Sequence, residues 1–291
     1  MAEHEFCRSE TDIFGYCRVK QYPSGAVELL ACDKPIFGGA GWEECMSADE
    51  ERRRAQRAGA PAQQRREDER SEAAQRDADD RARRRAASKV RDLALCNDFG
   101  WFVTLTLDAA KVDRYDMREI TRKLNNWCDN MVRRKGLRYV LVPERHKDGA
   151  VHFHGFFPDG CCDMIDSGTL SGGPVGAKPR RPRSAAQAAQ WEAAGAHRVY
   201  NVADWRLGFS TAIRLYGTYE SAVAYVCKYV RKQVDKVGGR WYYSGGKLEK
   251  PEVFYPDVSY RELEAVDGCY RFEVPGRRFV MVRLRNDDGG C

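Results

Sequence analysis

Two histidines and a glutamate in residues 139–157, YVLVPERHKDGAVHFHGFF, have the types and spacing of a metal site. Two runs rich in Val, Phe and Tyr flank a Lys-Asp-Gly turn, and this pattern predicts a β-hairpin with a three-residue loop. In that register Glu144 lies opposite His152, and His154 points to the same face two residues later. Two imidazoles and one carboxylate form a metal site with open positions. We therefore expect Glu144, His152 and His154 to bind a metal.

The register of this hairpin decides the prediction. A two-residue turn at Asp148 and Gly149 pairs Glu144 with Phe153 and puts the carboxylate on the opposite face. The nearest replacement ligand is then His146, which we otherwise expect to be exposed. Purely structural histidines are the alternative, but two histidines beside a glutamate are hard to bury without a ligand.

A second group with chemical potential lies in residues 219–233, YESAVAYVCKYVRKQ, which we predict to be a helix. Tyr225 and Tyr229 are one turn apart on one helical face, and Lys228 and Lys232 each follow a tyrosine by three residues. Tyr and Lys on a helix are often simple rim residues. Repetition of the pattern beside a metal site favours chemistry instead.

Tyrosine is a nucleophile only when activated, because its ordinary pKa is about 10. A divalent ion held by Glu and His can polarise the phosphorus of a phosphodiester, and a lysine can hold phosphate charge. This combination predicts cleavage of DNA through a covalent phosphotyrosine. We assign Tyr225 and Tyr229, assisted by Lys228 and Lys232, as the catalytic residues.

The elements around these residues predict an α+β protein. Residues 99–107 form an apolar, β-branched strand, residues 115–135 form an amphipathic helix that stops at Gly136, and short strands follow at 198–202, 209–215 and 240–244. Helices on a central antiparallel sheet suit this order. Before them, a hairpin is expected at 16–36.

The composition of the chain divides it into four regions. We place an N-terminal hairpin region at 1–42, a charged helical arm or linker at 43–92, the main domain at 93–250 and a C-terminal extension at 251–291. Residues 158–197 form an insertion in the main domain, expected as a Gly- and Pro-rich loop before a short helix at 184–194.

The formal net charge of +6 over 291 residues is a mild excess, so charge alone hardly argues for nucleic acid. Local clusters matter more. The sequence offers two candidate basic DNA contacts, each of which can equally be a solvated surface: the arm with Arg81, Arg83, Arg84 and Arg85, and the insertion with Lys178, Arg180, Arg181 and Arg183. Thr104 and Thr106 are either DNA contacts or ordinary strand residues.

The eleven cysteines form no CxxC pair, and the wide spacing of Cys7, Cys17, Cys32 and Cys45 disfavours zinc. Neither a signal peptide nor a long apolar run is visible. We expect a cytoplasmic protein with no membrane partner.

Three motifs together resemble a known family, the HUH endonucleases. They are WFVTLTL at 101–107, PERHKDGAVHFHGF at 143–156 and YVCKYVRK at 225–232. Within that family they look like the two-tyrosine rolling-circle replication initiators, or Rep proteins, of plasmids and small phages. The resemblance covers roughly residues 95–245.

The resemblance implies an RRM-like antiparallel sheet of about five strands, with the two ligand histidines on a central strand. It also implies Mg²⁺ or Mn²⁺, and nicking and rejoining of single-stranded or hairpin origin DNA through a 5′-phosphotyrosine. The chain lacks a G-x-x-x-x-G-K-[ST] motif, so a host helicase and a host DNA polymerase are the expected partners, with no small-molecule substrate.

Other functions share parts of this pattern. A non-haem iron oxygenase also uses two histidines and a carboxylate but needs no tyrosine pair. A zinc hydrolase normally carries its histidines on a helix. An HUH transposase, or a DNA-binding regulator without catalysis, remains the alternative within the DNA-binding class.

Overall fold

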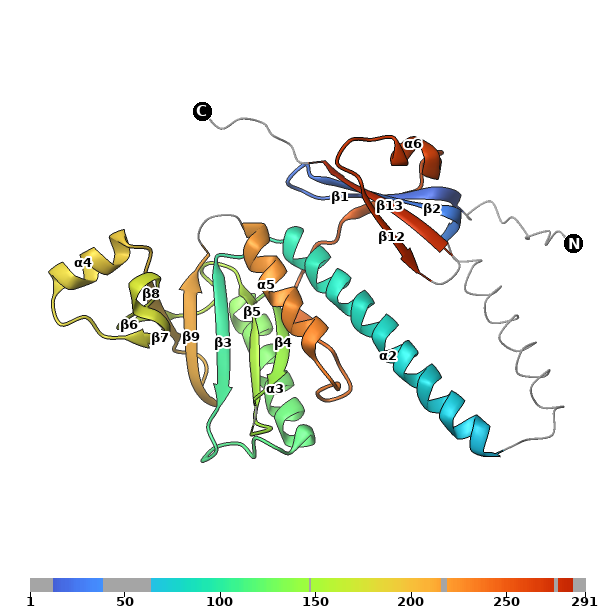
Figure 1. Cartoon of the computed structure of the whole chain (residues 1–291). Coiled ribbons are helices and arrows are strands. Elements are labelled where there is room, and N and C mark those ends of the chain that lie inside the picture. Colours follow the sequence, from blue (N-terminus) through green and yellow to red (C-terminus); the bar gives the residue numbers. More distant parts are fainter. Residues whose placement is uncertain (1–12, 39–63, 147, 216–218, 275–276, 285–291) are drawn as a thin grey trace, which may run out of the picture. The chain divides into compact units, whose positions relative to one another are not determined.

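The computed structural model describes residues 13–38, 64–146, 148–215, 219–274 and 277–284. The chain divides into two compact units, Arg76–Lys250 and the combination of Met1–Gln75 with Pro251–Cys291 (Figure 1). Both are built on antiparallel sheets with helices, as the predicted α+β class requires.

The larger unit contains an antiparallel sheet of eight described strands, more than the five expected. Their order across the sheet is β10-β4-β5-β3-β9-β8-β6-β7. The strands are β3 (Trp101–Leu107), β4 (Tyr139–Arg145), β5 (Val151–Phe157), β6 (Met164–Gly172), β7 (Gly176–Arg180), β8 (His197–Val202), β9 (Gly208–Arg214) and β10 (Tyr243–Gly245). The histidine strand β5 lies between β4 and β3, in the central position that the sequence predicted.

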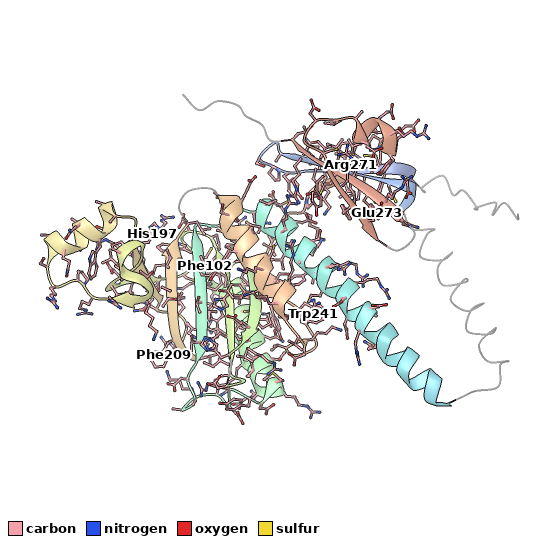
Figure 2. All side chains as sticks on the ribbon, viewed as in Figure 1. Phe102, His197, Phe209, Trp241, Arg271 and Glu273 are labelled. Carbon is pink, nitrogen blue, oxygen red and sulfur yellow. The ribbon has the colours of Figure 1, made fainter. Side chains whose placement is uncertain are left out.

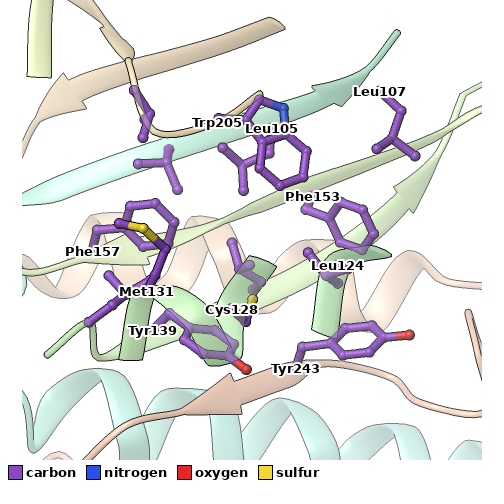
Figure 3. Close-up of a cluster of buried hydrophobic side chains, with 14 of the residues drawn as sticks. Leu105, Leu107, Leu124, Cys128, Met131, Tyr139, Phe153, Phe157, Trp205 and Tyr243 are labelled. Carbon is purple, nitrogen blue, oxygen red and sulfur yellow. The ribbon is translucent and has the colours of Figure 1, made fainter. Parts of the chain in front are cut away.

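One face of this sheet is covered by α3 (Met117–Lys135). Asp116 caps the start of α3 by accepting hydrogen bonds from the backbone N–H groups of Arg118 and Glu119, and Gly136 ends it in the left-handed conformation at φ 65°. Its buried side chains pack against every second residue of β3 and β5. Figure 3 shows this core, which includes Leu105, Leu124, Phe153, Phe157 and Tyr243.

The opposite face of the sheet is covered by α5 (Tyr219–Lys232) and by the end of α2 (Gln64–Leu95). Their buried residues share one cluster with the β4 side chains Val140 and Val142. The charged region 43–92 was expected to be an arm outside the core. Its described end instead buries Ala86, Ala87 and Val90, because small side chains there let two helices approach closely.

The β4–β5 hairpin has the predicted three-residue loop. The N–H of His146 donates to the carbonyl oxygen of Ala150 at 2.9 Å, and Gly149 has φ 86°. Glu144 pairs with His152 and Val142 pairs with His154, as the register argument required. The side of the sheet that carries the metal-type residues is therefore confirmed.

The expected loop in the first half of 158–197 is wrong. This segment forms β6, the short 3₁₀ helix η1 (Gly173–Val175) and β7, which extend the sheet beyond β8. Gly172, Gly173 and Gly176 all have positive φ, so the glycines that suggested a loop serve a tight reversal between strands. The short helix α4 (Ala185–Ala193) begins after its Ser184 cap, close to its predicted position.

The other unit has a five-stranded sheet of its own, in the order β11-β1-β2-β13-β12. The predicted hairpin corresponds to β1 (Ile13–Gln21) and β2 (Val27–Gly38). Joining it are β11 (Glu252–Phe254), β12 (Tyr270–Val274) and β13 (Arg277–Leu284), and α6 (Tyr260–Glu264) lies over β2 and β13. No helix in the described part of the chain is long and apolar enough to cross a membrane.

Candidate active site

The site is built on alternate residues of three neighbouring strands. Thr106 of β3 pairs with His152 of β5, and Thr104 pairs with His154. Paired residues of antiparallel strands point to the same face. Because Glu144 of β4 pairs with His152, the sheet itself places all five side chains on the face that carries α5.

Each histidine is held at Nδ1 by a threonine hydroxyl. The Oγ1 of Thr106 lies 3.0 Å from Nδ1 of His152, and the Oγ1 of Thr104 lies 3.0 Å from Nδ1 of His154. These contacts fix the ring orientation and leave Nε2 as the outward nitrogen. Whether the threonines also touch DNA stays a prediction.

The Nε2 of His154 lies 2.8 Å from a carboxylate oxygen of Glu144. The His154 ring is also sandwiched between aromatic rings. It stacks on Tyr229 at 4.3 Å between centroids and on Phe102 at 6.1 Å. His154 is therefore buried, oriented and in contact with both the carboxylate and the tyrosine helix.

His152 has a more open setting beside the loop. Its ring stacks on His146 at 3.7 Å between centroids. His146 is exposed, as expected, but it lies closer to the site than the sequence indicated. Burial, followed by the charges of His146 and His154, lowers the pKa of His152 to about 4. Burial also lowers the pKa of His154. Both rings are therefore neutral near pH 7, which is the form that ligates metals.

The two tyrosines meet at their hydroxyl groups. The Tyr229 hydroxyl donates to the Tyr225 oxygen at 2.6 Å, and their rings are nearly perpendicular at 5.1 Å. Burial, the bond to Tyr225 and the negative charge of Glu144 raise the pKa of Tyr229. Tyr225 is 50% exposed and packs edge-on against Phe102. The predicted pair thus forms one unit over His154.

The lysines of the helix are divided between two surroundings. Lys232 lines an open cavity of about 140 Å³ together with Glu144 and Tyr229. Lys228 is exposed on the turn before it. The structure therefore brings Lys232 to the site and leaves Lys228 at the solvent-facing side of the helix.

The fit of a metal to these residues is good in chemistry and incomplete in geometry. The donor set is two neutral imidazoles with supported Nδ1 atoms and one carboxylate, all on one face. In the described residues, however, no three His, Cys, Asp or Glu side chains are grouped as a metal site. Glu144 and His154 instead satisfy each other through a direct hydrogen bond.

The predicted basic DNA contacts lie away from this site. Arg180, Arg181 and Arg183 are exposed on or after β7, which is separated from β3 by three strands. Arg83 of α2 donates to the backbone oxygen of Gln233 and bonds to Asp80, so part of its role is structural. Contact of these residues with DNA stays a prediction.

Comparison with known proteins gives one similarity, over the segment that contains the site. Residues 100–234 match the family model of the replication-associated protein ORF2. This similarity begins just before β3 and ends just after α5, so it includes both histidines, Glu144 and both tyrosines. It associates the chain with replication. No curated protein and no solved structure matches the chain.

The sequence did not predict three contacts of this replication-associated segment. These are the threonine–histidine bonds, the edge-on packing of Phe102 against Tyr225, and the stacking of Tyr229 on His154. A signal was present, because Phe102, Thr104 and Thr106 alternate along one strand as His152 and His154 do. The pairing of β3 with β5 was needed to use it.

Proposed function

We propose that this chain is a replication initiator that nicks and rejoins single-stranded origin DNA, in the manner of the two-tyrosine HUH endonucleases. The observation that carries the proposal is the contact between the Tyr225–Tyr229 unit and the His154–Glu144 pair. The similarity of residues 100–234 to replication-associated proteins supports the same assignment.

The proposed reaction is an exchange of phosphodiester partners. A tyrosine oxygen attacks phosphorus, the new Tyr O–P bond forms and the bond from phosphorus to the 3′ oxygen breaks. The tyrosine proton is lost and the released 3′ oxygen gains one, so that a 5′-phosphotyrosine and a free 3′-hydroxyl result. The reverse step rejoins the strand, because the phosphoester bond is conserved.

Glu144, His152 and His154 are the residues that would hold a divalent ion, Mg²⁺ or Mn²⁺. When bound, such an ion supplies charge stabilisation at the reacting phosphate. Lys232 adds a positive charge in the cavity beside Tyr229, and Lys228 lies one turn earlier on the helix. Unwinding and synthesis are assigned to a host helicase and polymerase.

The first test of this proposal is a covalent adduct. The full chain is incubated with Mn²⁺ and labelled single-stranded oligonucleotides tiled across the replicon that carries the gene. We expect one region to be cleaved and its 5′ end to migrate with the protein on a denaturing gel. Absence of any adduct over all oligonucleotides overturns the nicking proposal, and retained binding without adducts favours the regulator instead.

The second test assigns the nucleophile. Tyr225→Phe and Tyr229→Phe keep the ring packing and remove one hydroxyl each. We expect the double variant to form no adduct, and mass spectrometry of the single variants to identify the linked residue. Adducts from the double variant exclude both tyrosines. Tyr219→Phe, on the same helix, is the matched control, because its hydroxyl donates to backbone oxygens of Ala94 and Asn97 away from the site.

A further inference from the structure

The sheet face that carries the site continues beyond α5 onto β9. Directly paired positions on four neighbouring strands form a single row: Glu144, His152, Thr106 and Phe209. Such pairs share a face of the sheet. Phe209 therefore extends the row of site residues by one strand, about 10 Å from His152 at two strand spacings.

Phe209 is placed unlike the other phenylalanine on this face. Its side chain is 70% exposed, and among the described residues it contacts no other aromatic ring. Phe102 on β3, in contrast, packs against Tyr225 and Phe156. Figure 2 labels both residues, with Phe209 near the start of β9. Nothing in the described core accounts for an aromatic side chain at this position.

The neighbouring part of the face is also uncovered. Ile165 of β6 is 57% exposed, and its paired residue Asn201 of β8 is exposed. Asn201 follows Tyr200, which pairs with core-facing Ala212, so Asn201 points to the same side as Phe209. No helix crosses β9 in Figure 1, whereas α5 packs on β4. Phe209, Asn201 and Ile165 define an open sheet face.

We propose that this open sheet face binds the single-stranded DNA next to the cleaved phosphate, with the Phe209 ring stacked on a base. The inference rests on the proposed function and names a contact that the reaction itself does not require. Bases of a single strand expose their π faces, so stacking on an aromatic residue is strong and tolerant of sequence. Bases in an intact duplex are already stacked on each other.

Continuity with the site favours DNA over a protein partner on this face. The row leads directly from the histidines to Phe209, so a strand whose phosphate lies at the site passes over the ring within about two nucleotides. Arg206, exposed just before β9, and Arg114, whose charge reaches His152, add positive charge near both ends of this path. Charges of this sign suit a phosphate backbone.

The experiment measures binding of an oligo-dT of about 20 nucleotides by fluorescence anisotropy, without metal and at fixed salt. Phe209→Ala is expected to weaken binding roughly five- to a hundredfold, the loss of one stacked base. Phe209→Trp is expected to restore it and Phe209→Leu is not. Tyr270→Ala, an equally isolated replacement of an aromatic residue that is 61% exposed in the other unit, is the control and is expected to bind like the full chain.

A second measurement does not depend on any variant. The unchanged chain is irradiated with oligo-dT that carries 5-iododeoxyuridine, and the cross-linked peptide is identified by mass spectrometry. A cross-link at Phe209 is expected. The inference is overturned if the chain does not bind oligo-dT, if Phe209→Ala binds like the unchanged chain, or if the cross-links lie elsewhere.

These outcomes are separable from failure of the proposed function. Loss of the Phe209 effect with adducts still forming overturns the open-face inference alone. Binding that depends on Phe209, from a chain that never forms adducts on any oligonucleotide, overturns the nicking proposal and leaves the DNA-binding face in place.

Discussion

At the scale of single residues, the two threonines explain how the histidines can serve two states. Ionised Glu144 only accepts hydrogen bonds, so in the direct contact Nε2 of His154 carries the proton and Nδ1 accepts from Thr104. A metal at Nε2 requires the other tautomer, in which Nδ1 carries the proton. A threonine hydroxyl can donate or accept, so it supports both forms without moving.

This arrangement predicts that Thr106→Val weakens metal binding. Valine keeps the shape of the side chain but removes the partner of His152, and loss of such a partner costs about 10- to 100-fold in affinity. Isothermal titration of the chain with Mn²⁺ measures the effect, and Thr106→Ser is expected to restore affinity. Equal affinity of Thr106→Val and the unchanged chain would show that His152 needs no support or binds no metal.

At the scale of elements, the distance along the chain decided what the sequence could predict. The β4–β5 hairpin is local, so its turn residues fixed the register of Glu144 against His152. Helix α3 was equally clear, because its apolar spacing and Gly136 are local signals. The pairing of β3 with β5 and the docking of α5 join distant segments, and their contacts could be known only from the structure.

The close approach of β4 and β5 gives an element-scale prediction at Gly155. A Cβ added there would lie 1.9 Å from the backbone oxygen of Val140, which cannot move without shifting β4. Gly155→Ala is therefore expected to lower the free energy of unfolding by about 3 kcal/mol.

Chemical denaturation monitored by circular dichroism measures this loss of stability. Gly100→Ala is the matched control, since its new Cβ meets only the exposed carboxylate of Asp159, which can rotate away. Equal stability of the two variants would show that β4 and β5 can separate at little cost.

At the scale of the whole molecule, two features could not be predicted from the sequence for the same reason. The end of α2 looked solvated, because alanines and arginines carry little apolar signal until a partner helix is placed against them. The strands of 252–284 had no evident role until β13 was found beside β2. Each needed a partner that lies far away in sequence.

The division into units predicts that residues 76–250 fold when expressed alone. Both large buried clusters of this unit, and all site residues, lie inside that range. We expect the fragment to unfold in one cooperative thermal transition and to form the same tyrosine adducts as the full chain. A gradual melt with no transition would contradict the independence of this unit.

The pairing of β2 with β13 also has a consequence for synthesis on the ribosome. Residues 76–250 are translated between these two strands, so the hydrogen-bonding edge of β2 emerges early and gains β13 only near completion. An uncovered edge is open to wrong partners, including the same strand of another nascent chain. Nascent chains that stall before residue 277 would therefore carry a finished nuclease-like unit beside an aggregation-prone hairpin.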